Sequence, residues 1–112
     1  MARFVLMLRD SEWNPQELSP EDIQQVIERY NTWSRKIRAN GHKLRDAEGR
    51  VVRRNGSGLA VTDGPYAEAK EIIGGIMMVE AADYDEAVRL CQESPHLDFG
   101  PIEIRQIEET GG

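Results

Sequence analysis

Five consecutive apolar residues, Phe4–Leu8, constrain the fold of this chain more than any other feature. A strand with one buried face alternates apolar and polar residues, whereas a strand that is apolar throughout is covered on both faces. The run is far shorter than the ~20 residues that a membrane-spanning helix needs. We therefore expect a soluble protein with no membrane partner, whose first strand is packed on both sides.

A long amphipathic helix is predicted over residues 20–40. Ser19 supplies a side-chain acceptor for a free backbone N–H, and Pro20 suits the first helical turn. Asn40–Gly41 is typical of a helix C-terminus. The apolar positions recur every three or four residues and form one stripe, which consists of Ile23, Val26, Ile27, Tyr30, Trp33 and Ile37.

A short hairpin and a longer strand are predicted in the middle of the chain. Val51–Val52 and Leu59–Val61 flank the turn-forming segment Asn55–Gly58. The next strand spans Ile72–Glu80. The glycine pair Gly74–Gly75 inside this strand predicts a bulge or the close approach of another backbone.

A second helix and a last strand complete the prediction. Asp83 caps the helix, and an acid follows three residues later. Ser94–Pro95 ends the helix, and the alternation of Ile102–Arg105 predicts the last strand. The helix has its own apolar stripe, made of Tyr84, Ala87, Val88 and Cys91.

The predicted order, β-α-β-β-β-α-β, is typical of an α+β, ferredoxin-like fold with two helices on one face of an antiparallel sheet. The hairpin is then an insertion. Because two helices leave the other face of the apolar first strand uncovered, we expect a second copy of the chain to cover it across a two-fold axis. A length of 112 residues fits one domain, which we place at residues 1–108, with a flexible tail at 109–112.

Cysteine and charge content bear on location and partners. The single cysteine, Cys91, cannot form an internal disulfide, which favours the cytoplasm, and we interpret it as a small core residue.

Residues 35–54 carry a net charge of +6 and the rest of the chain −12, which gives −6 overall. This basic segment either is a solvated helix end and hairpin or binds an anionic partner. No aromatic residue lies between Trp33 and Tyr66 to stack on bases, so we expect no nucleic-acid partner.

The segment Asp63–Pro65 has two interpretations. In the structural one, the aspartate accepts a backbone N–H in a turn, Gly64 permits a positive φ and the proline fixes the next φ. In the functional one, Asp63 is a general base or a polar anchor at the mouth of a pocket. Lys70 and Tyr66, four residues apart, either transfer protons from a buried site or belong to surface ion pairing worth well under ~1 kcal/mol.

Two histidines are the remaining acid/base candidates. His96 follows a helix-stopping proline and precedes Asp98, so it either transfers protons or caps the C-terminal end of the second helix. His42 lies in the basic segment and is assigned no role. We expect no metal and no cofactor, because the sequence has no His/Cys cluster with ligand spacing, no P-loop and no G-x-G-x-x-G motif.

Residues 61–71, VTDGPYAEAKE, followed by Gly74–Gly75, resemble the signature of the YCII-related, DGPF-type family. That signature is TDGPFAETKE and a glycine pair that enters a strand. Tyr66 replaces the usual phenylalanine, and Ala69 replaces the usual threonine. The ending, residues 94–105, is also similar to the closing pattern of the family, so the resemblance covers nearly the whole chain.

The resemblance implies a dimeric α+β barrel, in which two ferredoxin-like sheets face each other across the two-fold axis. It implies no established reaction. The wider YCII group is associated with acid/base chemistry by a His–Asp pair whose histidine lies in the first helix, but residues 20–40 of this chain contain no histidine. Some family members occur beside or fused to sigma factors for extracytoplasmic functions, which implies a regulatory alternative by association.

The resulting hypothesis is a homodimer with a pocket between sheet and helices that binds a small polar or anionic metabolite and performs cofactor-independent acid/base chemistry. Asp63 would accept the proton, with His96 as its partner. The ligand would be bound by three further polar residues, Tyr66, Glu68 and Lys70. The alternatives are a non-catalytic interaction module that uses Arg35–Arg54 and a motif that only builds the dimer interface. Enzymatic activity is left open.

Overall fold

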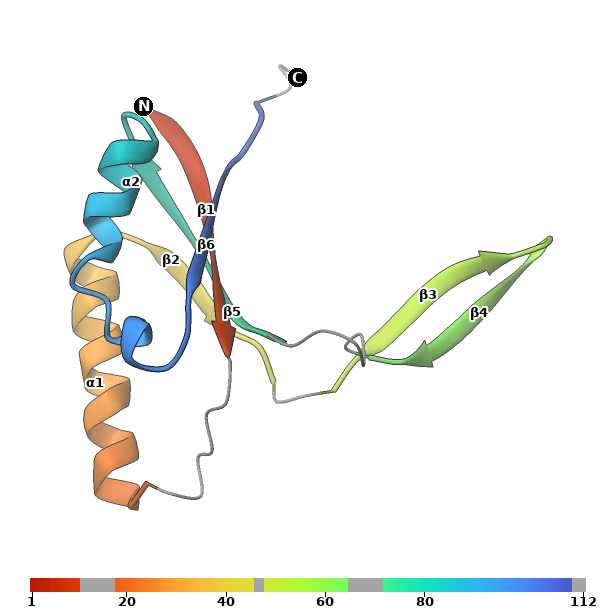
Figure 1. The fold of residues 1–112 in the computed structure, drawn as a ribbon, viewed down its shortest axis with the longest axis horizontal. Coiled ribbons are helices and arrows are strands. Elements are labelled where there is room, and N and C mark those ends of the chain that lie inside the picture. The colour runs from red at the N-terminus through yellow and green to blue at the C-terminus, as the bar shows by residue number, and fades with distance from the viewer. Residues whose placement is uncertain (11–17, 46–47, 65–71, 110–112) are drawn as a thin grey trace.

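A four-stranded antiparallel sheet forms the main part of the molecule. The computed structural model describes residues 1–10, 18–45, 48–64 and 72–109. The order β2-β5-β1-β6 places β1 between β5 and β6, with β2 at one edge (Figure 1). This is the ferredoxin-like α+β arrangement that the element order predicted. The four strands are β1 (Ala2–Asp10), β2 (Asn40–Lys43), β5 (Ile72–Ala81) and β6 (Ile102–Gln106).

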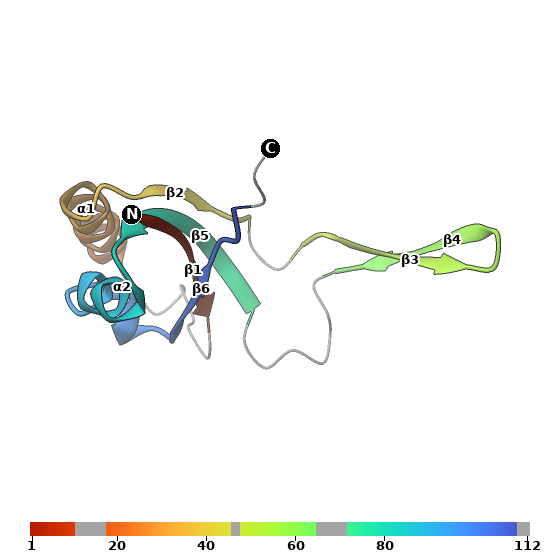
Figure 2. The same cartoon turned by 90° about the horizontal axis from the view of Figure 1, so that it is seen from above.

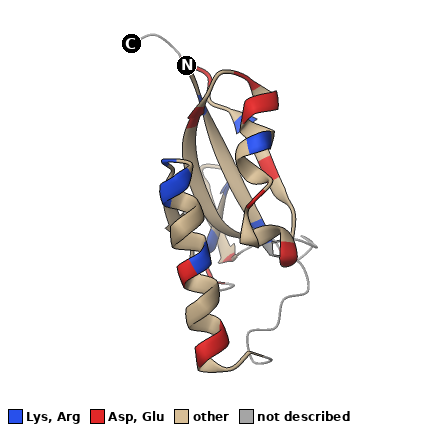
Figure 3. Ribbon diagram, turned by 90° about the vertical axis from the view of Figure 1, so that its left-hand side faces the viewer, with Lys and Arg blue, Asp and Glu red and all other residues tan. Residues whose placement is uncertain are grey.

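Two helices, α1 (Pro20–Lys36) and α2 (Tyr84–Cys91), lie on one face of this sheet, and a short 3-10 helix, η2 (Pro95–Asp98), follows α2 (Figure 2). The predicted N-caps are confirmed. The Ser19 hydroxyl accepts a hydrogen bond from the N–H of Asp22 at 3.0 Å, and the Asp83 carboxylate accepts one from Glu86 at 2.9 Å. Acids in the first turn of α1 and bases in its last turn complement the helix dipole (Figure 3).

The predicted end of the first helix at Asn40–Gly41 is wrong. Helix α1 ends at Lys36, and Arg38 takes the left-handed conformation (φ 57°) that turns the chain. Asn40 and Gly41 then begin β2, which pairs with β5. This strand was missed because all four of its residues are exposed, and an edge strand without buried positions lacks the alternation that predicts a strand.

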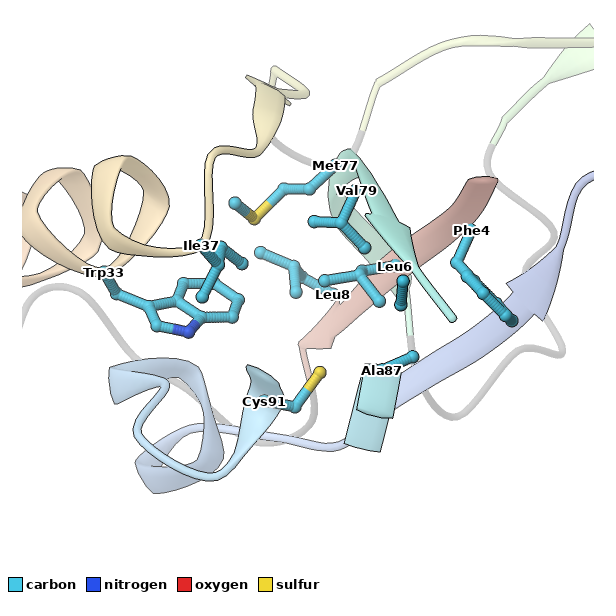
Figure 4. Close-up of a cluster of buried hydrophobic side chains, with 10 residues drawn as sticks. Phe4, Leu6, Leu8, Trp33, Ile37, Met77, Val79, Ala87 and Cys91 are labelled. Carbon is cyan, nitrogen blue, oxygen red and sulfur yellow. The ribbon is translucent and has the colours of Figure 1, made fainter. Parts of the chain in front are cut away.

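The core lies between the sheet and the helices. Alternate residues of β1 and β5 face the helices, and Phe4 and Leu6 are fully buried. The indole Nε1 of Trp33 donates to the carbonyl oxygen of Leu90 at 2.8 Å and so joins α1 to α2. The core cluster (Figure 4) consists of Phe4, Leu6, Leu8, Trp33, Ile37, Met77, Val79, Ala81, Ala87 and Cys91.

The opposite face of the sheet is apolar at its centre as well. The register of β1 and β5 sets Val5 beside Met78 and Met7 beside Ile76. Because side chains alternate along a strand, these four point away from the core and the helices. They are partly exposed, and Met78 is 42% exposed. The described part of the chain places no helix over this face (Figure 2).

The glycine pair in β5 produces the predicted bulge. The register of β1 with β5 shifts between Leu8, which lies opposite Gly75, and Arg9, which lies opposite Ile73. Gly74 is therefore the extra residue. Such a bulge bends the strand and changes the direction of the groups around it, here at the end of β1 where Arg9 lies.

A hairpin of β3 (Arg50–Asn55) and β4 (Gly58–Asp63) forms a separate two-stranded sheet. It projects from the side of the main sheet that faces away from the helices (Figures 1 and 2). The sequence predicted this hairpin with shorter strands. Among the described residues, no helix is long and apolar enough to cross a membrane.

Candidate functional site

A cavity of about 550 Å³ lies between α1 and the sheet. Ile23 and Val26 line it from α1, and Leu8 and Met77 line it from the strands. Gly74 at the bulge also borders the cavity, so the glycine pair of the sequence signature lies at its wall. A mostly apolar cavity with a few polar groups is the usual form of a small-molecule site. The polar groups at its wall include Tyr30, Asn31, Ser34, His42, Lys43 and His96.

His96 is buried at the wall of this cavity, with 2% of its surface exposed. Helix η2 holds it, and the backbone N–H of His96 donates to the Ser94 hydroxyl at 3.1 Å. The ring makes two further hydrogen bonds of 2.8 Å: Nδ1 with the hydroxyl of Tyr30 and Nε2 with the carbonyl oxygen of Arg9. His96 thus joins η2 to α1 and to the end of β1.

The two partners fix the tautomer of the neutral His96 ring. A carbonyl oxygen can only accept, so Nε2 must carry the proton and donate to Arg9. Nδ1 is then an acceptor, and the Tyr30 hydroxyl donates to it. The ring can take a proton from Tyr30 at Nδ1 while Nε2–H keeps its bond to Arg9. Tyr30 and His96 therefore form a hydrogen-bonded pair capable of acid/base chemistry at the cavity wall.

The sequence left two roles open for His96: proton transfer, or capping of the C-terminal end of α2. The hydrogen bonds of its ring go to Tyr30 and Arg9, and not to Asp98 or to the end of α2. Asp98 is exposed and pairs with Arg29 at 3.4 Å. Tyr30 was missed, because its spacing predicted only a member of the apolar stripe of α1. The available signal was chemical: a partly buried tyrosine hydroxyl usually finds a hydrogen-bond partner.

Asp63 lies at the base of the β3–β4 hairpin, away from this cavity. Its side chain is 92% exposed, and its carboxylate lies 3.4 Å from the guanidinium of Arg50. Gly64 does not adopt the positive φ that a glycine permits. A larger residue would be crowded there, because a Cβ would lie 3.2 Å from the backbone nitrogen of Arg50 and 3.3 Å from the carbonyl carbon of Gly49.

The other predicted site residues, Tyr66, Glu68 and Lys70, lie outside the described residues. The basic segment does not form one surface. Its first part lies at the C-terminal end of α1, where Lys36 pairs with Glu93. Its second part lies on β3, at the far side of the sheet (Figure 1).

Cys91 is a buried core residue, as predicted, with 6% of its surface exposed. Burial raises the pKa of its thiol from 9.0 to about 11. Between these values the unfolded chain loses the proton and the folded chain keeps it, so this contribution to stability is present below pH 9 and is lost as the pH rises to 11. Urea unfolding at pH 8 and pH 10.5 should show the advantage of the wild type over Cys91→Ala shrink by about 1–2 kcal/mol. A constant difference would contradict the burial of this thiol.

Within the described ranges, no group of three or more His, Cys, Asp or Glu side chains is arranged to hold a metal ion.

No curated protein matches the chain. The family model of the YCII-related domain matches residues 2–110, nearly the whole chain. With the glycine pair of its signature at the cavity wall and its ferredoxin-like sheet, the chain belongs to the YCII-related domain family.

Proposed function

We propose that this protein is a homodimer that binds a small metabolite in the cavity between α1 and the sheet and performs acid/base chemistry there without a cofactor. The single observation that carries the proposal is the Tyr30–His96 pair at the cavity wall. A buried histidine with a defined tautomer and a tyrosine donor is a group suited to proton transfer.

The cavity walls suggest the chemistry of the ligand. Leu8, Ile23, Val26 and Met77 offer an apolar surface to the body of a small organic molecule. Lys43 lines the same cavity from β2 and adds positive charge. We therefore propose a small metabolite with an apolar body and one polar or anionic group. A donor on the ligand would bind the Tyr30 oxygen, because the hydroxyl proton is already donated to His96, and an anionic group would be attracted to Lys43.

The proton would move along the pair in either direction. When the Tyr30 oxygen takes a proton from the ligand, its own proton passes to Nδ1 of His96, and the Nε2–H bond to Arg9 stabilises the resulting imidazolium. The reverse transfer restores both groups. Because Asp63 does not line the cavity of its own chain, its proposed role as a proton acceptor requires the Asp63 of a second copy.

The uncovered face of the sheet supports the homodimer. Val5, Met7, Ile76 and Met78 form an apolar group at its centre. A monomer would leave this group in water, whereas a second sheet packed across a two-fold axis would bury it. The expected mass in solution is therefore about twice the 12.7 kDa of one chain.

The binding test uses matched pairs of small aromatic and aliphatic carboxylic acids and their amides, observed by NMR on the protein. Binding should shift the methyl signals of Val26 and Met77. Tyr30→Phe removes one hydroxyl and should weaken binding about tenfold, a difference of about 1.4 kcal/mol. Tyr84→Phe is the matched control, because the Tyr84 hydroxyl accepts from the N–H of Gln106 outside the cavity, and it should leave binding unchanged.

Two outcomes would contradict the proposed site: shifts confined to residues outside the cavity, or equal affinity for the wild type and Tyr30→Phe. Asp63→Asn provides a separate measurement. Weakened binding in that variant would support the role predicted for Asp63, and unchanged binding would leave Asp63 with its structural contact to Arg50 alone.

A further inference from the structure

We propose that the β3–β4 hairpin is an arm that packs against the body of a second copy of this chain. The inference rests on the homodimer proposed above and goes beyond it, because it names a second contact surface outside the sheet. Each copy of the dimer would then hold the other with its arm.

One face of the arm carries exposed apolar side chains that a second surface could cover. Val52 pairs with Val61, and Arg54 pairs with Leu59, so these four side chains share a face. The three apolar members are all exposed: Val52 at 58%, Leu59 at 65% and Val61 at 57%. A two-stranded hairpin alone is marginally stable in water, so an apolar face on such a hairpin indicates that a further surface covers it.

The position of the arm identifies that surface. The arm projects from the uncovered side of the sheet, so a second copy that covers the sheet lies beside the arm (Figure 2). Packed sheets lie ~10 Å apart, and six-residue strands extend ~20 Å. The arm is therefore long enough to pass the second sheet and contact the body of the partner.

The shape of one copy is consistent with a subunit of an assembly. Its radius of gyration is 16.3 Å, whereas a compact domain of this length has a radius of about 13 Å. The projecting arm makes the molecule extended, and a second copy beside the arm would make the whole particle more compact.

The charge of the arm also favours a second copy of the chain as its partner. The arm, residues 50–63, contains three arginines and one aspartate, while the chain as a whole carries −6. Two copies that meet only through their acidic bodies repel each other. A basic arm against the acidic body of the partner reduces this repulsion and favours the pairing.

The test measures the dimer dissociation constant by sedimentation velocity for the full chain. The arm variant is Val52→Thr/Leu59→Thr/Val61→Thr, which keeps β-propensity and removes the apolar face. It should raise the dissociation constant at least tenfold. The matched control, Val51→Thr/Ala60→Thr, changes the opposite face of the same arm and should change it less than threefold. A photo-crosslinker at position 59 should join two copies that carry different tags.

The outcomes separate this inference from the homodimer itself. A wild type that stays at 12.7 kDa at all concentrations would contradict both. A dimer that Met78→Lys dissociates, but that the arm variant leaves intact and the crosslinker does not join, would overturn the arm and keep the homodimer. Circular dichroism of each variant shows whether it is folded. If the arm variant does not fold, the crosslink from position 59 still tests the contact between the arm and the second copy.

Discussion

Replacing Phe4 by alanine should lower the free energy of unfolding by about 3–5 kcal/mol, measured by urea denaturation. Phe4 is fully buried in the core between the sheet and the helices. Its ring meets that of Tyr84 edge to face, with centroids 4.9 Å apart and an interplanar angle of 74°. Alanine removes this contact and leaves a cavity between the sheet and α2, so lost burial and lost packing add together.

The control for this prediction is Val88→Ala on the same helix as Tyr84. Val88 is 49% exposed, so its truncation should change stability by no more than about 0.5 kcal/mol. Phe4→Leu keeps most of the buried volume and remains informative if the alanine variant fails to fold. Equal losses for Phe4→Ala and Val88→Ala would contradict the assignment of Phe4 to the inner face.

The fold was predictable where local chemistry decides it. The strands β1 and β5 are marked by their apolar residues, and both helix starts by caps that bind the backbone within three residues. The end of α1 was not predictable in this way. Arg38 adopts a positive φ without being glycine, and Asn40–Gly41, a sequence typical of a helix end, begins an edge strand instead.

The site was less predictable, because long-range packing builds it. His96 stood out as one of two histidines, but its partners lie 66 and 87 residues away in the sequence. Neither Tyr30, a member of an apolar stripe, nor a backbone carbonyl carries a local signal. Conversely, Asp63 stood out by its motif, yet the hairpin carries it away from the cavity of its own chain.

His96→Ala should cost about 3–4 kcal/mol of stability, because it removes a fully buried ring together with the two hydrogen bonds that the ring makes. The Arg9 carbonyl loses a donor, and the Tyr30 hydroxyl loses an acceptor. Tyr30→Phe removes only one of these hydrogen bonds and should cost about 0.5–1.5 kcal/mol. His42→Ala, at the other histidine, changes an exposed residue and should stay within about 0.5 kcal/mol.

The tautomer of His96 provides a second test of the two hydrogen bonds of its ring, which does not depend on a measurement of stability. Nitrogen-15 NMR of the imidazole rings should show the Nε2–H form at His96 in neutral solution, because only a protonated Nε2 can donate to the Arg9 carbonyl. Tyr30→Phe should keep that tautomer and shift the signal of Nδ1, the atom that loses its donor. An Nδ1–H form in the wild type would contradict the hydrogen bond from Nε2 to the Arg9 carbonyl. It would also contradict the proton path from Tyr30 to His96, because Nδ1 would then donate to the tyrosine oxygen and could not accept from it.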